Sequence, residues 1–184
     1  MAENSRIRTI EQATGRTWED WCRFLDGVGA RDLDHAQIAP KVHAELEGSV
    51  ESAGWWAQSV TVAYEQFIGR RLPGQRADGR FETSVSRSTP FDMRELMDRW
   101  EQFAAGDESV RDLVVGDARV SGSERRLTWR ARAADGSSLV VTSEPKKNGT
   151  ASLVVTHAGL PSPEAMAAAR DTWAAVAGRF LGRD

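Results

Sequence analysis

Cysteine is almost absent from this 184-residue chain, and long apolar runs are absent altogether. The single thiol, Cys22, excludes an intramolecular disulfide and fits a reducing compartment. No apolar stretch follows the first six residues, so no signal peptide is visible, and no run approaches the roughly 18 apolar residues that a membrane span needs. We therefore expect a cytoplasmic protein with no membrane association.

Catalytic motifs are missing as well. The sequence shows no glycine-rich phosphate loop, no Ser-His-Asp order, no paired-carboxylate signature and no cysteine in a nucleophile context. Cys22, His35 and His43 complete no spacing that would hold zinc. We expect no metal, no cofactor and no catalytic residue, although acids such as Glu82 and Glu144 remain free to converge in the fold.

Positive charge is scarce in the first part of the chain. The net charge is −3, of which residues 1–69 carry −5 and residues 70–184 carry +2. An acidic N-terminal part is poorly suited to gripping a phosphate backbone. Its best candidate for a DNA-recognition helix, residues 55–66, has no Lys or Arg and includes Glu65, so a nucleic-acid partner is not expected.

Apolar spacing predicts a helical module over residues 1–69. Thr17 is a good N-cap, and the stripe that follows it at helical spacing consists of Trp18, Trp21, Cys22 and Leu25. A shorter helix is expected before it over residues 7–13, and Asp34 caps a third helix that Pro40 delays or kinks. A fourth helix follows Gly54, and its predicted inward face holds Trp56, Val60, Ala63 and Phe67.

The pattern changes after a Gly-, Pro- and Arg-rich linker predicted over residues 70–79, and residues 80–184 then read as an α+β domain. A strand with period-two alternation begins at Phe81, a helix begins at Asp92, and a short strand is expected near residues 113–120. Residues 126–132 form the clearest half-buried strand. Asp135-Gly136 and Asn148-Gly149 predict hairpin turns into two more strands, and Ser162 caps a long final helix. This order predicts an antiparallel sheet with helices on one face.

Two family resemblances add to these predictions. Residues 13–21, Ala-Thr-Gly-Arg-Thr-Trp-Glu-Asp-Trp, and residues 54–66, which begin Gly-Trp-Trp-Ala-Gln, resemble a small bacterial helical domain of unknown function. Residues 80–184 resemble the START-like (SRPBCC) superfamily, in the branch similar to the activator of Hsp90 ATPase. That resemblance rests on the opening strand Phe81–Thr89, the two hairpin turns, and His157-Ala158-Gly159-Leu160-Pro161 before a helix containing Trp173.

The second resemblance implies a helix-grip fold, in which a curved antiparallel sheet wraps a long C-terminal helix. In many members of the superfamily a hydrophobic ligand lies between the sheet and the helix. The chain departs from the superfamily pattern because it is short and its residues 106–122 are compressed, which argues against a large cavity.

Candidate site residues lie between the predicted sheet and its helices. His157 is in phase with Leu153 and Val155, so it points to the apolar face, where a polar side chain needs a partner. A satisfied structural histidine is favoured over an acid–base group. The residues that either line a ligand pocket or simply fill the core are Trp100, Phe103, Leu127, Trp129, Val141, His157, Met166 and Trp173.

Aromatic and basic residues elsewhere have two interpretations each. Trp18, Trp21, Trp55 and Trp56 are expected to pack in the helical core, with an aromatic ligand platform as the alternative. Arg126, Arg130 and Arg132 are expected on the solvent face of one strand, next to Arg125, and the junction carries Arg70, Arg71, Arg76 and Arg80. A solvated face is the default for both patches. The alternatives are a nucleic acid, an acidic partner and the chain's own acidic helical module, and the contact with that module is the second choice.

The leading functional hypothesis is a non-enzymatic binding protein. The START-like domain would hold a small hydrophobic ligand or a partner segment, and the helical module would mediate protein contact or cover the pocket. The alternatives are a structural or interaction protein with a filled core, such as a homodimer through the helical module, and an enzyme that uses His157 as acid or base.

Overall fold

The computed structural model describes residues 2–182, with side chains from Arg6 onward, and divides into two compact units between Pro73 and Gly74. Each unit has its own hydrophobic core. Within the described residues, no helix is both long enough and apolar enough to span a membrane.

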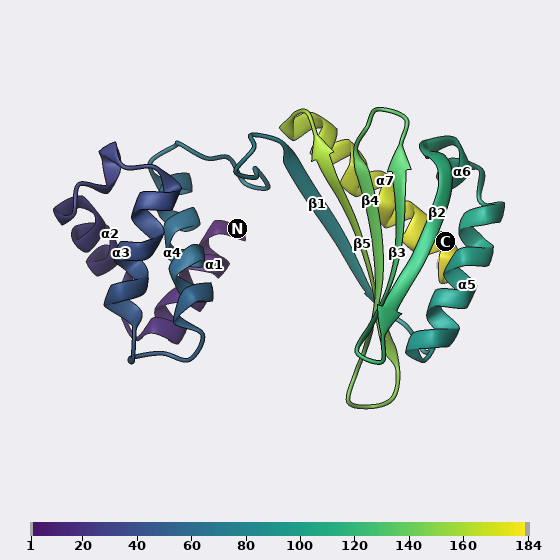
Figure 1. The fold of residues 1–184 in the computed structure, drawn as a ribbon, viewed down its shortest axis with the longest axis horizontal. Helices are drawn as coiled ribbons and strands as arrows, with labels where there is room; N and C mark the ends of the chain where they lie inside the picture. Colours follow the sequence, from purple (N-terminus) through teal and green to yellow (C-terminus); the bar gives the residue numbers. More distant parts are fainter. Residues whose placement is uncertain (1, 183–184) are drawn as a thin grey trace. The chain divides into compact units, whose positions relative to one another are not determined.

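The first unit is entirely helical (Figure 1). Its elements are α1 (Ala2–Thr14), α2 (Trp18–Gly27), the 3-10 turn η1 (Ala30–Asp32), α3 (His35–Leu46) and α4 (Ala53–Phe67). Thr17 caps α2 by accepting from the Asp20 amide, as predicted. Asp34 forms a capping box with Gln37, and this fixes the first turn of α3 directly after Asp34, so Pro40 does not delay the helix.

The core of the helical unit contains fewer tryptophans than predicted. Trp21 is fully buried and Trp18 and Trp56 are half-buried, but Trp55 is 62% exposed. Phe67 was also placed inward, and it is 54% exposed. The reason is a rotated inward face of α4, on which Tyr64 takes the place assigned to Phe67 and fixes the rotation by donating its hydroxyl to Asp26 Oδ1 at 2.7 Å.

The second unit is an α+β domain, as predicted (Figure 1). Its strands are β1 (Phe81–Ser88), β2 (Val114–Ser123), β3 (Arg126–Ala133), β4 (Ser138–Pro145) and β5 (Ala151–Leu160). Its helices are α5 (Met93–Gly106), α6 (Glu108–Leu113) and α7 (Pro163–Phe180). Asp92 and Ser162 cap α5 and α7 through their side chains.

The sheet is antiparallel throughout, in the order β1-β5-β4-β3-β2. Side chains of α5 and α7 join the inward residues of the strands in one core, so both helices cover the same face and leave the other face open. A five-stranded antiparallel sheet packed on a long C-terminal helix is compatible with a helix-grip fold. The strand expected near residues 113–120 is longer than predicted, since β2 runs to Ser123.

The predicted linker is largely bound at both of its ends. Arg70 donates to the carbonyls of Arg31 and Leu33, and Arg71 pairs with Glu65 at 3.0 Å, so these residues belong to the helical unit. On the other side of Pro73, the carbonyl of Gly74 accepts from the Glu82 amide, which makes residues 74–80 a turn that leads into β1.

Candidate binding sites

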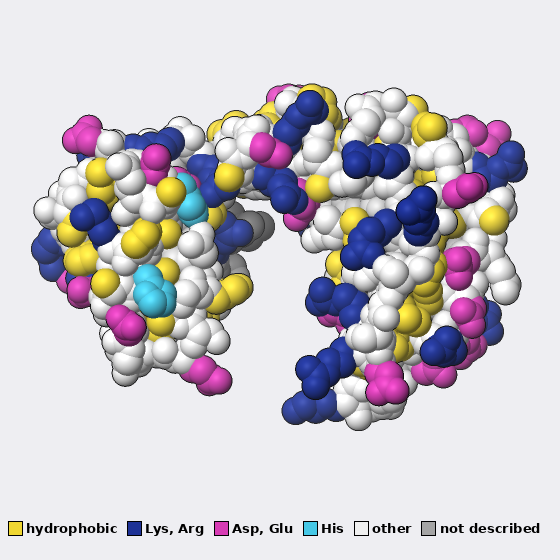
Figure 2. All heavy atoms as spheres, in the orientation of Figure 1, with side chains coloured by type: hydrophobic (Ala, Val, Ile, Leu, Met, Phe, Trp, Pro, Cys, Tyr) yellow, Lys and Arg dark blue, Asp and Glu magenta, His cyan; other side chains and the backbone are white. Residues whose placement is uncertain are grey.

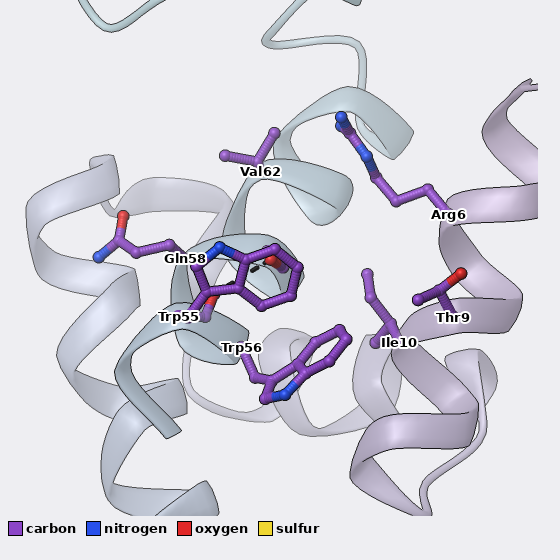
Figure 3. A pocket seen from close by; sticks show the side chains of 8 residues that line it. Arg6, Thr9, Ile10, Trp55, Trp56, Gln58 and Val62 are labelled. Atoms are coloured by element: carbon purple, nitrogen blue, oxygen red, sulfur yellow. Dashed lines mark hydrogen bonds between the residues drawn. The ribbon is translucent and has the colours of Figure 1, made fainter. Parts of the chain in front are cut away.

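A groove lies between α1 and α4 on the helical unit (Figure 3). Its volume is about 490 Å³. On one side stand the two indole rings of α4, and on the other side the α1 residues Arg6, Thr9 and Ile10. The remaining lining residues come from α4 and are Gln58, Ser59 and Val62. We call this surface the α1–α4 groove.

The sequence of α4 produces the groove through two adjacent stripes. Ala57, Val60 and Tyr64 face the core, whereas Trp55, Ser59 and Val62 follow one another at i, i+4 and i+7 on the neighbouring stripe. The indole rings of Trp55 and Trp56 meet edge to face, with centroids 4.4 Å apart. The small Ser59 side chain donates to the Trp55 carbonyl and leaves room beside the rings.

The groove is mainly apolar and carries one cation. Arg6 stands at its rim and donates to Gln66 Oε1 at 3.1 Å. No carboxylate belongs to the lining residues from Arg6 to Val62. Covering the exposed part of Trp55 would remove on the order of 100–150 Å² of apolar surface from water, a stabilisation of about 3 kcal/mol. The groove is therefore suited to an apolar group that has a carboxylate next to it.

His157 of β5 is buried in the α+β unit and bonded at both ring nitrogens. Trp173 Nε1 donates to His157 Nδ1 at 3.1 Å, and His157 Nε2 lies 2.7 Å from Ser137 Oγ. Ser137 Oγ in turn donates to Asp135 Oδ1 at 2.5 Å. The predicted Asp135-Gly136 hairpin turn supplies Ser137 and Asp135, because it places residues 135–137 beside the end of β5.

This chain of bonds defines the state of the imidazole. An indole N–H is only a donor, so Nδ1 accepts and the ring proton sits on Nε2, which donates to Ser137. Burial lowers the pKa of His157, and the Asp135 carboxylate opposes that shift only in part. The hydrogen bonds from the Ser137 hydroxyl and amide lower the pKa of Asp135. Ser137 has its proton directed at Asp135, so His157 does not act as its base.

The other predicted pocket residues form a packed aromatic core. Trp100 contacts Trp129 edge to face with centroids 5.9 Å apart, and it contacts Phe180 at 5.4 Å. Phe103 fills the space beside Phe180, with ring centroids 5.3 Å apart. The fully buried members of the predicted set are Trp100, Trp129, Val141 and Trp173, and the partly buried members are Phe103, Leu127 and Met166.

A shallow depression of about 360 Å³ opens between α5, α6 and β2. Its lining includes the buried residues Trp129, Ala104 and Val110 and the acids Glu101 and Asp117. Among the predicted pocket residues, Trp129 alone lines it. The neighbouring indole Nε1 of Trp100 is buried without a hydrogen-bond partner, which is a cost that native cores normally avoid.

Reactive and metal-binding groups are few among residues 2–182. These residues contain no group of three or more His, Cys, Asp or Glu that is arranged to hold a metal ion. Burial raises the pKa of the Cys22 thiol, and burial together with the Asp26 hydrogen bond raises the pKa of Tyr64 to about 12. Neither group is therefore activated as a nucleophile.

Comparisons with known proteins give no assignment. The chain matches no protein-family model, and no curated protein matches it.

The sequence predicted that His157 needs a partner but did not identify that partner. It named Trp55 and Trp56 within the alternative of an aromatic ligand platform, but it did not predict the α1–α4 groove or the part of α1 in it. The available signal was the second apolar stripe of α4, formed by Trp55 and Val62. It was hidden by the stronger neighbouring pattern of Trp56 and Val60.

Proposed function

We propose that this protein is a non-catalytic binding protein whose helical unit holds a segment of a partner protein in the α1–α4 groove. The observation that carries the proposal is the exposure of Trp55 inside a groove lined by Ile10, Trp56 and Val62. Trp and Arg are the residue types most enriched at the energetic centres of protein interfaces. The groove places Trp55 and Arg6 together.

The expected partner segment carries an apolar side chain and an acidic residue close to it. The apolar side chain would cover Trp55 and Trp56, and the acid would pair with Arg6. We further propose that the α+β unit is START-like. The order of its elements and the helices on one sheet face support this, whereas its filled aromatic core favours the partner version of the function over a small hydrophobic ligand. A cytoplasmic location is part of the same proposal.

A peptide library tests the groove. Random peptides displayed on phage are selected on the wild-type protein and counter-selected on the Trp55→Ala variant. The enriched peptides are then synthesised, and their affinities are measured by calorimetry. We expect a motif that pairs an apolar residue with an acid, and a loss of about tenfold or more in affinity for Trp55→Ala. The variant Arg6→Glu should reverse the preference for the acid.

The matched control is Phe67→Ala, which removes another exposed aromatic side chain that does not line the groove. Trp55→Ala removes the edge-to-face contact with Trp56, and Phe67→Ala removes the one with Trp18, so each variant should lose a similar, small amount of stability, about 0.5–1.5 kcal/mol, and stay folded. Peptides that bind Trp55→Ala as well as the wild type would remove the groove from the function. Sedimentation of both variants shows whether the occupant is a second copy of the chain.

The small-ligand version is the second candidate, and the depression lined by Trp129 favours it. A small apolar ligand would fit that depression. Native mass spectrometry of protein purified without detergent tests it, and a single mass equal to that of the bare chain counts against it. The enzyme version is disfavoured because both nitrogens of His157 are already bonded.

A further inference from the structure

β2 is an open edge of the sheet. It pairs with β3 on one side only, and the described chain has no strand on its other side. Every residue of β2 after Val114 is exposed. Its pairing with β3 is interrupted over residues 116–118, where Gly116 has a φ of 73°. The regular segment left for pairing is Arg119–Ser123. Along an antiparallel edge, alternate residues direct their amide and carbonyl groups outward.

Two arginines face each other next to this edge. Arg119 of β2 is directly opposite Arg130 of β3, so both side chains lie on the same face of the sheet. Arg132 lies two residues further along β3 on that face, which is the one that the helices leave open. In Figure 2, Lys and Arg side chains run down the visible face of the α+β unit. We call Arg119, Arg130 and Arg132 the arginine cluster.

The arginine cluster is not neutralised within the described residues. The Arg130 side chain donates to Ser121 Oγ at 2.8 Å, and the side chains of Arg119 and Arg132 have neither a hydrogen bond nor an ion pair with the described residues. Glu144 on the neighbouring strand β4 lies at the level of Arg126 and pairs with it, not with the cluster. Like charges at directly opposed positions destabilise a sheet. Two arginines that repel each other at an open edge create a local positive potential, and such a potential attracts anions.

The opposite side of the same strand is apolar. Val120 pairs with Trp129 and therefore points to the helix-covered face, yet it is 37% exposed because it lies at the edge. An added strand beside Arg119–Ser123 would place its side chains alternately next to the arginine cluster and next to Val120.

We propose that β2 is a docking edge for an extended acidic segment of a partner protein, which adds to the sheet as a further strand. The segment would alternate acidic residues, directed at the arginine cluster, with aliphatic residues, directed at Val120. Backbone bonds to the open edge provide affinity, and the alternation provides specificity. This site is separate from the α1–α4 groove and does not depend on it.

A peptide fits this surface better than a nucleic acid does. Single-stranded nucleic acids bind sheet faces by stacking bases on aromatic side chains. The aromatic residues of the five strands are Phe81 and Trp129, and both are buried in the core. The open face therefore has charge but no stacking platform.

The test uses the full chain and a fluorescent peptide of about nine residues that alternates Asp and Val, long enough to span the regular part of the edge. Three probes are compared with it: the same composition with Asp and Val in separate blocks, the alternating peptide N-methylated at every second amide, and a single-stranded oligodeoxythymidine. We expect the alternating peptide to bind with a Kd below about 1 mM and the other probes to bind at least about tenfold more weakly. Bound peptide should also slow amide hydrogen exchange at residues 119–123.

The variants separate local from general electrostatics. Arg119→Glu and Arg130→Glu should weaken binding by about tenfold or more. The matched control Arg170→Glu makes the same charge change at an exposed position of α7 and should leave binding unchanged. Equal binding of the N-methylated peptide or the oligonucleotide, or an equal effect of Arg170→Glu, overturns strand addition. If no peptide binds and Arg119→Val makes the chain self-associate, Arg119 only guards the edge against pairing, and the proposal fails.

Discussion

Replacing His157 tests whether it holds the α+β unit together as a neutral, fully bonded side chain. The variant His157→Leu keeps a similar volume but leaves the Trp173 N–H without an acceptor in a position that is 1% exposed. An unsatisfied buried donor costs about 1–3 kcal/mol. The variant His157→Gln should lose less, since its amide carries both an acceptor for Trp173 and a donor for Ser137.

The pH dependence gives the sharper result. Because burial lowers the pKa of His157 in the folded state, the unfolded chain takes up the proton first as the pH falls. The stabilisation is therefore complete above the ordinary histidine pKa of about 6.5 and is lost below it, by at most about 1.4 kcal/mol per pH unit. His157→Gln removes this contribution, so its stability relative to the wild type should stay level from pH 7.5 to about pH 6.5 and improve from there to pH 5.

The assay must report on the α+β unit alone, because both units contain tryptophan. Urea unfolding is followed by ¹⁹F NMR of fluorotryptophan-labelled protein, in which the signal of Trp173 reports this unit and that of Trp21 reports the helical unit. A constant difference between His157→Gln and the wild type over this pH range would refute the neutral, buried assignment. A gain in stability for His157→Leu at pH 7.5 would refute the role of the Trp173 bond.

Three further changes test other contacts. Hydrogen bonds from Arg179, Ser109 and Val110 lower the pKa of Asp107 to about 2, so Asp107→Asn, which keeps the helix cap, should cost about 1 kcal/mol at pH 7 and nothing near pH 2 in the same urea assay. Gly122→Ala should destabilise the β2–β3 hairpin by about 1–3 kcal/mol and speed hydrogen exchange of β2, because Gly122 has a φ of 156° and a Cβ there would lie 2.2 Å from the Arg126 carbonyl oxygen. Arg71→Leu leaves the buried Glu65 carboxylate with the His35 imidazole beside it but without the guanidinium, and it should cost the helical unit about 1–3 kcal/mol, read from the Trp21 signal.

The elements with strong local signals were predictable from the sequence. The Asp135-Gly136 and Asn148-Gly149 turns fix the hairpins, and period-two alternation identifies β3 and β5, because both kinds of signal act between near neighbours in the chain. The caps at Thr17, Asp92 and Ser162 follow from the same local chemistry.

Features that depend on which of two faces is buried were harder to predict. α4 has apolar residues on two adjacent stripes. The stripe with Tyr64 is buried and Trp55 is left outside, and this choice involves contacts between residues far apart in the sequence, such as the bond from Tyr64 to Asp26. β2 is exposed on both faces, so its sequence lacks the alternation of apolar and polar residues from which a half-buried strand is predicted. The like-charged pair of Arg119 and Arg130 depends on a register shift over residues 116–118. Gly116 is the local signal of that irregularity, but a single glycine does not specify the resulting register.

The packing of the α+β core bears on the choice between a partner segment and a small ligand. Pockets that enclose small molecules have volumes of about 300–1,000 Å³, and a cavity of that size between the sheet and α7 would require a tryptophan such as Trp100 or Trp129 to leave its place. Removing such a side chain from a core costs about 3–5 kcal/mol. The contacts of a small apolar ligand would have to offset that free energy before any net binding appeared. The exposed Trp55 and Val120 carry no such cost, since they already face water and gain from being covered. These energetics favour the proposed binding at Trp55 and Val120 over a ligand in the sheet–helix core, where the tryptophans are packed.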